Sequence, residues 1–426
     1  MVAACTCRNA VEIYKFRPVP SKFGMKKSIE DLALFGGRPS VTEKLHVGRP
    51  NIGTRESLLR RINDLLDRRW LTNHGPFVDE FEQHIASLVH VKHCIAICNG
   101  TLALQILIRA LELKGEVIVP SFTFVATAHA LEWQGITPVF CDIDPRTHNL
   151  DARQVEDLIT SRTSGIIGVH VWGRPCDVNS LTTIARKRNL RLIFDGAHAL
   201  NCVYGGRHVG NFGHAEMFSF HATKILNTFE GGAVVTNDDD LARTVRLMRN
   251  FGFADYDSVV SVGINGKMSE VCAAMGLASL ESLDEFTTVN HRNYNAYQER
   301  LKNVSGLDVV PYDESENPNY QYVVLEVDAD VTQITRDQLQ AVLWAENILA
   351  RRYFYPGCHQ VEPYISRPFS VGSPLTHTEY LVKRVLCLPT GTTVTIESID
   401  EICEIICFAI TYGAQIRHRL ERHPIL

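Results

Sequence analysis

Four short apolar runs decide the fold class: GEVIVPSF (115–122), TPVFCDID (137–144), GIIGVHVWG (165–173) and LRLIFDGAH (190–198). Each is rich in β-branched residues, and EMFSFHA (216–222) and GGAVVTND (231–238) repeat the pattern. Helical segments such as RQVEDLIT (153–160) and VNSLTTIARKRN (178–189) separate several of these runs. Strands that are apolar on both faces and joined by helices predict an α/β protein with a mostly parallel sheet covered by helices on both sides.

The chain has 426 residues, more than the roughly 250–300 that one hydrophobic core usually serves. An amphipathic helix is expected over residues 56–70, and the α/β pattern ends near Ser282. We therefore predict a large domain with an N-terminal arm over residues 25–282 and a smaller α+β domain over 283–426. In the smaller domain we expect helices over 285–303 and 335–347, strands over 320–328 and 350–357, and a helix from Ser398. Residues 1–24 lack periodicity and are predicted to be a disordered extension, with Met25 as an alternative start.

Composition excludes several classes of protein. Hydrophobic residues make up 45% and charged residues 21%, and the net charge of -5 offers no basic surface for nucleic acid or anionic membranes. The sequence shows neither an apolar run of membrane-spanning length nor a signal peptide, so we predict a cytoplasmic protein. The 12 cysteines lie in apolar runs and are expected to be free thiols. Cys5 and Cys7 lack a second pair at zinc-site spacing, so no metal is expected.

Ligands of an open parallel sheet bind beyond the carboxyl ends of its strands, and two such places carry anion-binding or aromatic residues. Asn99, Gly100 and Thr101 open a helical segment whose free N–H groups predict an anion site, although a simple asparagine cap explains them equally well. Phe122 and Phe124 come directly after the strand-like part of the segment that begins at 115. An aromatic ring there suits either stacking on a flat cofactor or packing in the core.

Two further places supply ionisable groups. Asp195 ends the apolar part of the segment 190–198, and His198 follows three residues later. A buried carboxylate there needs a partner such as a protonated ring nitrogen; a helix cap is the alternative. Lys224 follows FSFHAT (218–223), and a desolvated lysine becomes a nucleophilic amine, although most lysines are merely solvated. A phosphate anchor, a stacking surface, an acid and an amine are together what pyridoxal phosphate requires.

Seven segments in order resemble the nucleotide-sugar aminotransferases of the DegT/DnrJ/EryC1/StrS family, which are fold type I pyridoxal phosphate enzymes. They are NGTLAL (99–104), EVIVPSFTFVATAHAL (116–131), HVWGRPCDV (170–178), FDGAHA (194–199), FSFHATK (218–224), EGGAVVTND (230–238) and GINGKMSEVCAAMGL (263–277). The resemblance runs from about residue 32 to about residue 408. VGRPN (47–51), WLTNHGP (70–76), ARRYFYPGCHQVEPY (350–364) and LCLPTGT (386–392) are most similar to members that aminate C4 of dTDP-4-dehydro-6-deoxy-D-glucose with L-glutamate.

The resemblance assigns roles to individual residues. It implies that Lys224 is the Schiff-base lysine and that Asp195 pairs with the pyridinium nitrogen. Phe124 is expected to stack on the ring and His198 to lie near the cofactor. Three further residues are implied as phosphate ligands: Gly100, Thr101 and Ser219.

Other positions carry implications for assembly and substrate. Asn265 resembles an asparagine that reaches the phosphate from a second subunit, which implies a homodimer with shared sites. His359 matches a histidine at the mouth of the site. Lys267 stands where many relatives have arginine, so a carboxylate-binding role there does not transfer directly. Arg49 and the Arg351, Arg352 pair are candidates for the substrate diphosphate, with a solvated surface position as the alternative.

The presence of a lysine at position 224 favours transamination, because the related sugar dehydratases have histidine there. Within the family, amination at C3 or of another nucleotide-linked ketosugar is the alternative. A transcription regulator with an aminotransferase fold would need a basic DNA-binding domain, and neither terminus offers one. A nicotinamide-linked oxidoreductase would need a glycine-rich fingerprint that NGTLAL does not fit.

Overall fold

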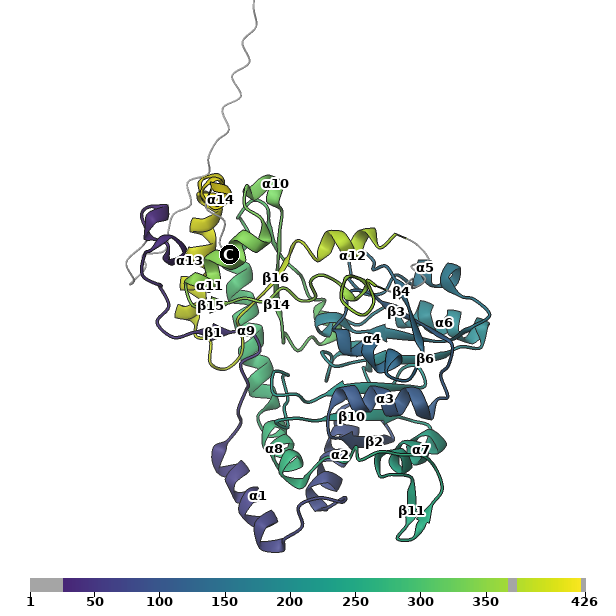
Figure 1. Ribbon diagram of the computed structural model, residues 1–426. Coiled ribbons are helices and arrows are strands. Elements are labelled where there is room, and N and C mark those ends of the chain that lie inside the picture. The colour runs from purple at the N-terminus through teal and green to yellow at the C-terminus, as the bar shows by residue number, and fades with distance from the viewer. Residues whose placement is uncertain (1–25, 367–373, 423–426) are drawn as a thin grey trace, which may run out of the picture.

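A seven-stranded sheet forms the centre of the computed structural model, which describes residues 26–366 and 374–422 (Figure 1). The strand order is β2-β10-β9-β6-β5-β3-β4, and only β10 runs antiparallel to its neighbours. Six of these strands confirm the predicted runs, whereas β2 was not predicted. The strands are β2 (His93–Ile97), β3 (Glu116–Pro120), β4 (Thr137–Cys141), β5 (Thr163–Val169), β6 (Arg191–Asp195), β9 (Ala215–Ser219) and β10 (Gly232–Thr236).

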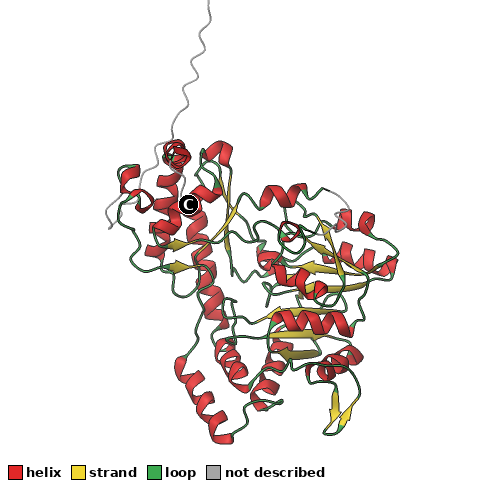
Figure 2. Ribbon diagram, viewed as in Figure 1, coloured by secondary structure: helices red, strands yellow, loops and turns green. Residues whose placement is uncertain are grey.

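Helices cover both faces of this sheet, because its strands are apolar on both sides. In β6, Phe194 packs into the core on one face and Ile193 into the core on the other; Figure 2 shows the covering helices in red. Asn99 and Asp177 cap two of them through their side chains. The helices are α1 (Arg55–Arg68), α2 (Pro76–Leu88), α3 (Gly100–Ala110), α4 (Val125–Glu132), α5 (Ala152–Val155), α6 (Val178–Arg188), α7 (Asp239–Arg249) and α8 (Glu270–Leu280).

A second core lies at the other end of the long helix α9 (Leu283–Leu301), which extends away from the large sheet in Figure 1. Leu32, Val41 and Leu45 of the N-terminal arm pack into this core. The division between residues 282 and 283 stays a prediction. The elements here are β1 (Leu45–His46), paired with β15 (Ile348–Leu349); β13 (Leu307–Val309), β14 (Val323–Val327) and β16 (Val385–Leu388), which form an antiparallel sheet; and α10 (Ala329–Thr332), α11 (Arg336–Ala345), α12 (Thr376–Leu381), α13 (Ile396–Thr411) and α14 (Gly413–Arg422).

The strand predicted over residues 350–357 is wrong. β15 ends at Leu349, and only Arg351 forms an isolated bridge, with Cys387 of β16. The chain then turns, because the Tyr355 N–H donates to the Arg352 carbonyl over 2.7 Å. Tyr353, Phe354 and Tyr355 suggested a strand in the sequence. In the structure their side chains line cavities and do not alternate between the two faces of a sheet.

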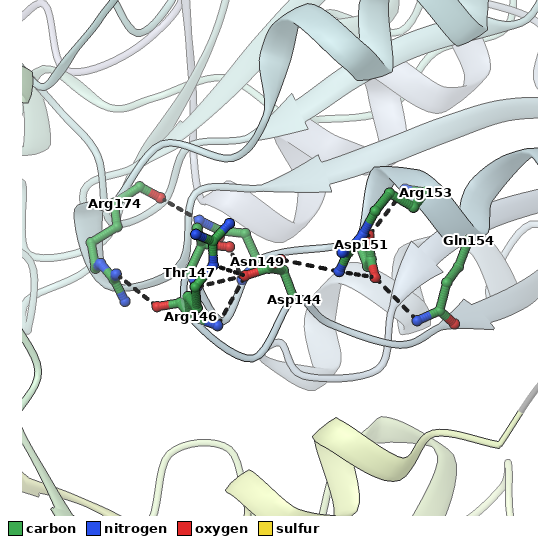
Figure 3. A network of polar contacts seen from close by, with 8 residues as sticks. All are labelled: Asp144, Arg146, Thr147, Asn149, Asp151, Arg153, Gln154 and Arg174. Atoms are coloured by element: carbon green, nitrogen blue, oxygen red, sulfur yellow. Dashed lines mark hydrogen bonds and ion pairs between the residues drawn. The ribbon is translucent and has the colours of Figure 1, made fainter.

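A polar network ties the loop after β4 to the segment after β5 (Figure 3). The Asn149 amide donates to the carbonyl oxygens of Arg174 and Pro175 over 3.0 and 3.1 Å, and its oxygen accepts from the Val171 N–H over 3.0 Å. Arg174 in turn donates to the Arg146 carbonyl over 3.1 Å. This network fixes the turn at Val171–Gly173, which contacts the site described below.

Among residues 26–366 and 374–422, every helix is too short or too polar to cross a bilayer. The predicted cytoplasmic location stays a prediction. The cysteines that the structure describes are free thiols, as predicted. The predicted extension over 1–24, Met25, Cys5 and Cys7 lie outside the described residues.

Candidate active site

One cavity of about 230 Å³ at the carboxyl ends of the sheet strands contains most of the residues singled out in the sequence. Its wall comes from the loops after β3, β6 and β9, from the start of α3, and from Tyr322, Tyr353 and Phe354 of the C-terminal part. The predicted residues that line it are Asn99, Gly100, Thr101, Phe124, Asp195, His198, Ser219 and Lys224.

The start of α3 lies tightly against β9 and β10. A Cβ atom added to Gly100 would lie 3.1 Å from the Ser219 Cβ, and one added to Gly232 would lie 2.6 Å from the Gly100 backbone nitrogen. The Asn99 side chain accepts the Leu102 N–H over 2.8 Å, so Asn99 caps the helix, which was the alternative to an anion site in the sequence analysis. The first backbone N–H groups of α3 still border the cavity beside the Ser219 hydroxyl, which makes this wall suited to an anion.

Asp195 is buried at the end of β6, with 6% of its surface exposed. Its two carboxylate oxygens accept hydrogen bonds from the Thr127 hydroxyl over 2.8 Å and from the Ala197 N–H over 3.0 Å. Burial raises the pKa of Asp195, while these hydrogen bonds and the Lys224 charge oppose the rise. A buried carboxylate held this way suits a cationic partner in the cavity.

Thr127 was not identified from the sequence. It lies on α4, and its hydroxyl is 3.0 Å from that of Thr123, which lines the cavity. The two threonines are four residues apart, with Thr123 just before the start of α4 at Val125. That spacing was the available signal, but threonine is too common near a helix start to stand out.

Lys224 follows β9 and points its amine into the same enclosed space. Burial lowers the pKa of Lys224 to about 8, although the negative charge of Asp195 works in the other direction. A substantial fraction of the amine is therefore unprotonated near neutral pH, which gives Lys224 the nucleophilic character predicted from the sequence.

Aromatic groups form the remaining wall. Phe124 is 55% exposed and lines the cavity, whereas Phe122 is buried and packs edge-on against Trp172 with ring centroids 5.4 Å apart. The His198 ring lies parallel to that of Phe354 at 5.9 Å. Of the two phenylalanines after β3, Phe124 alone therefore offers a face to a flat ligand, and Phe122 belongs to the core.

His198 is held as a neutral ring. Burial, together with the Lys224 charge, lowers the pKa of His198 well below its ordinary value. Its Nδ1 accepts the backbone N–H of Trp172 over 3.2 Å, which leaves the proton of the neutral ring on Nε2. His198 is thus a hydrogen-bond donor at the cavity wall.

Three predicted site residues lie outside this cavity. The Nδ1 atom of His359 is 2.6 Å from the Ser121 hydroxyl, and its Nε2 atom is 3.5 Å from a Glu379 oxygen. Arg49 is exposed. Asn265 is also exposed and pairs with Asn250 through a single bridge.

Lys267, the departure from the family pattern, does not line the cavity either. Its amine donates to the Asn250 side chain over 2.9 Å and lies 4.9 Å from the centre of the Phe251 ring. Both contacts are within the same chain, and neither involves a carboxylate. They therefore give no support to a carboxylate-binding role for Lys267.

Comparisons with known proteins agree with this geometry. The model of the DegT/DnrJ/EryC1/StrS aminotransferase family matches residues 53–407. The dTDP-4-amino-4,6-dideoxy-D-glucose transaminase of Shigella dysenteriae is 36% identical over 351 residues, covering 82% of this chain and 94% of that protein. The GDP-perosamine synthase of Caulobacter vibrioides is 38% identical over 307 residues, covering 71% and 82%.

Among solved structures, DesI in the presence of its TDP-sugar product superposes with a TM-score of 0.89. It is 48% identical and covers 92% of this chain and 100% of that chain. The likeness supports the fold type I assignment made from the sequence.

The residues of the cavity fit pyridoxal phosphate. Lys224 offers an amine of lowered pKa, Asp195 a buried carboxylate for the ring nitrogen, and the start of α3 an anion site. The chain belongs to the DegT/DnrJ/EryC1/StrS aminotransferase family and is a pyridoxal phosphate-dependent sugar aminotransferase.

Proposed function

We propose that this enzyme transfers the amino group of L-glutamate to C4 of dTDP-4-dehydro-6-deoxy-D-glucose. The products are dTDP-4-amino-4,6-dideoxy-D-glucose and 2-oxoglutarate. The observation that carries the proposal is the 48% identity to DesI, whose structure was determined with its TDP-sugar product. The Shigella relative, named for this sugar, supports the same substrate.

Each side chain of the cavity has a separate role in the proposed reaction. When bound, pyridoxal phosphate supplies an electron sink for a carbanion. The Lys224 amine takes the proton from the substrate carbon that carries nitrogen, because its lowered pKa leaves it unprotonated often enough to act as a base. The Asp195 carboxylate would keep a proton on the cofactor's ring nitrogen. The start of α3 and Ser219 would hold the phosphate, and Phe124 would offer its face to the ring.

A homodimer with shared sites is part of the proposal. The hairpin of β11 (Phe253–Asp255) and β12 (Ser258–Val259) projects from the body of the chain beside α7 (Figure 1). Tyr256 and Val262 on this segment are 96% and 75% exposed, and Asn265 follows directly. Exposed apolar groups of this kind suit an interface, and Asn265 would then lie beside a second chain. Light scattering of the holoenzyme tests this, and a monomer at micromolar concentration would contradict it.

The alternative substrates concern the nucleotide and the carbon. The Caulobacter relative is named for a GDP-linked sugar, so a GDP-4-ketosugar is a specific competitor. Purified enzyme with L-glutamate should be assayed against dTDP- and GDP-linked 4-ketosugars and a dTDP-linked 3-ketosugar. Mass spectrometry detects the amino product, and NMR locates its amino carbon. Efficient turnover of only the GDP-linked or 3-keto compound would overturn the proposed substrate, but not the transamination.

The pKa of Lys224 predicts how cofactor capture depends on pH. Its folded-state pKa is depressed to about 8, so the unprotonated, reactive fraction of the amine rises with pH, reaches one half near pH 8 and is nearly complete about one pH unit higher. We expect the rate of cofactor capture by the apoenzyme to rise about 10-fold per pH unit below 8 and then level off. Stopped-flow absorbance between pH 6 and 10, with free N-acetyl-lysine as the reference amine, measures this. A rate that keeps rising through pH 10 would show an ordinary lysine.

A further inference from the structure

Asp195 belongs to a hydrogen-bond network of three side chains that begins at the cavity wall. The Thr127 hydroxyl donates to one carboxylate oxygen of Asp195 over 2.8 Å, and the Thr123 hydroxyl lies 3.0 Å from that of Thr127. All three residues are buried, and Thr123 and Asp195 line the cavity. Because little water competes for these groups, the hydrogen bonds between them are stronger than they would be at the surface.

The direction of each hydrogen bond in this network follows from the charge of Asp195. An ionised carboxylate can only accept, so Thr127 donates its single hydroxyl proton to Asp195. The Thr127 oxygen is then an acceptor, and the Thr123 hydroxyl donates to it. Donation therefore runs from Thr123 to Thr127 to Asp195, and this order requires that Asp195 is ionised.

The backbone that carries the two threonines is held from both sides. The Thr127 N–H donates to the Phe124 carbonyl over 3.1 Å at the start of α4. The Cys358 thiol donates to the Thr123 carbonyl over 3.3 Å, and the Cys358 N–H donates to the Ser121 carbonyl over 2.9 Å. These contacts leave the segment little freedom to move either hydroxyl away from its partner.

The Thr127 hydroxyl affects both the charge and the orientation of Asp195. Burial raises the pKa of Asp195, whereas the hydrogen bonds from the Ala197 N–H and the Thr127 hydroxyl lower it. Thr127 donates to Oδ2 and the Ala197 N–H donates to Oδ1. The carboxylate therefore cannot rotate about its Cβ–Cγ bond without losing a hydrogen bond, which is costly for a buried oxygen.

Two other titratable side chains also favour the ionised form of Asp195, namely Lys224 and His170. The His170 ring lies 3.2 Å from a Glu216 oxygen, and the His170 backbone N–H donates to the Asp195 carbonyl over 3.0 Å. Both act on the carboxylate through their charge alone. Within residues 26–366 and 374–422, Thr127 is the only residue whose side chain donates a hydrogen bond to the carboxylate of Asp195.

We propose that Thr127 is a positioning residue for transamination, because its hydroxyl, oriented by Thr123, keeps Asp195 ionised and turned toward the cofactor's ring nitrogen. The inference rests on the proposed function, in which Asp195 keeps a proton on that nitrogen. One proton has two places to reside, the carboxylate and the ring nitrogen. A hydrogen bond donated to the carboxylate makes it less basic and so favours the nitrogen.

The visible absorbance of the lysine-bound cofactor tests this proposal in the absence of substrate. A positive charge on the ring nitrogen lowers the pKa of the nitrogen that joins Lys224 to the cofactor, so losing that charge moves the pH midpoint of the absorbance change upward. Thr127→Val keeps the shape but removes the hydroxyl, and is expected to raise the midpoint by at least about half a pH unit. Thr123→Val acts through Thr127 and should raise it less.

Thr127→Ser retains the hydroxyl and is expected to keep the wild-type midpoint. In a protein that also carries Asp195→Asn, Thr127→Val should cause no further shift, because the carboxylate on which it acts is gone. Thr183→Val is the matched control, since Thr183 is an exposed α6 residue whose hydroxyl donates to the Asn179 carbonyl over 2.9 Å. Its midpoint should equal that of the wild type.

Thermal unfolding shows whether each variant is folded, and Thr127→Ala replaces Thr127→Val if the latter does not fold. An unchanged midpoint in the folded variant that lacks the hydroxyl would overturn the inference, as would a shift of the same size in Thr127→Ser. The effect of Asp195→Asn alone separates the two proposals. If it raises the midpoint and Thr127→Val does not, only the inference fails. If it leaves the midpoint unchanged, the proposed contact of Asp195 with the ring nitrogen fails, and the role of Thr127 with it.

Discussion

Replacing Lys224 with arginine is expected to lower transamination by at least about 10⁴-fold. A guanidinium keeps its proton at any working pH, so it can neither bond to the cofactor's aldehyde nor take a proton from substrate carbon. The measurements are turnover with L-glutamate and the nucleotide-linked ketosugar, and the visible absorbance of lysine-bound cofactor. Both should disappear together.

Lys187→Arg is the control for this experiment. Lys187 is an exposed residue of α6 that pairs with Glu156, far from the cavity lining. The same chemical change there should leave turnover and absorbance intact. Turnover of Lys224→Arg within about 100-fold of the wild type would remove Lys224 from the role of proton carrier.

Changing Asp195 to asparagine is expected to slow both half-reactions by about 10²- to 10³-fold. The amide retains the shape, and its single oxygen can still accept the Ala197 N–H, while its NH2 group can only donate to the Thr127 hydroxyl. It lacks the charge that would keep the ring nitrogen protonated. Single-turnover absorbance with L-glutamate measures the first half-reaction, and the ketosugar measures the second. A loss confined to one of the two would contradict a role in both.

Asp177→Asn is the matched control for the charge. Asp177 caps α6 by accepting the Ser180 N–H over 3.0 Å, and an asparagine oxygen can do the same. We expect that variant to react at the wild-type rate. A comparable slowing in both variants would mean that the effect at Asp195 comes from general damage to the fold.

The strands and their ends were predictable because both depend on local patterns. β3, β4, β5 and β6 are continuous apolar runs, and the polar residue after each run is visible in the sequence. The position of β10 was not predictable, since nothing in GGAVVTND shows that it runs antiparallel between β2 and β9. That arrangement follows from how distant segments pack.

The part of the site that sequence reasoning missed comes from such distant packing. Three aromatic residues reach the cavity from the C-terminal part of the chain: Tyr322, Tyr353 and Phe354. The last two lie in the segment 350–357, which the sequence wrongly predicted to be a strand. Thr127 contacts Asp195 between α4 and β6, which lie far apart in the sequence, so the weak spacing signal at Thr123 and Thr127 does not reveal the partner. In contrast, Asp195 and Lys224 were found because Asp195 is the last residue of β6 and Lys224 lies in the loop that follows β9.

The close approach of Gly232 to Gly100 has a consequence for folding. Among the described strands β2 pairs only with β10, so β2 joins the sheet only when the strand after Lys224 is inserted. That contact closes a long loop and must offset its entropy, which makes it a late event in sheet assembly. A ligand that bridges Lys224 and the start of α3 selects the completed sheet and raises the free energy of unfolding by mass action. Cofactor occupancy therefore reports whether the last strand has been inserted.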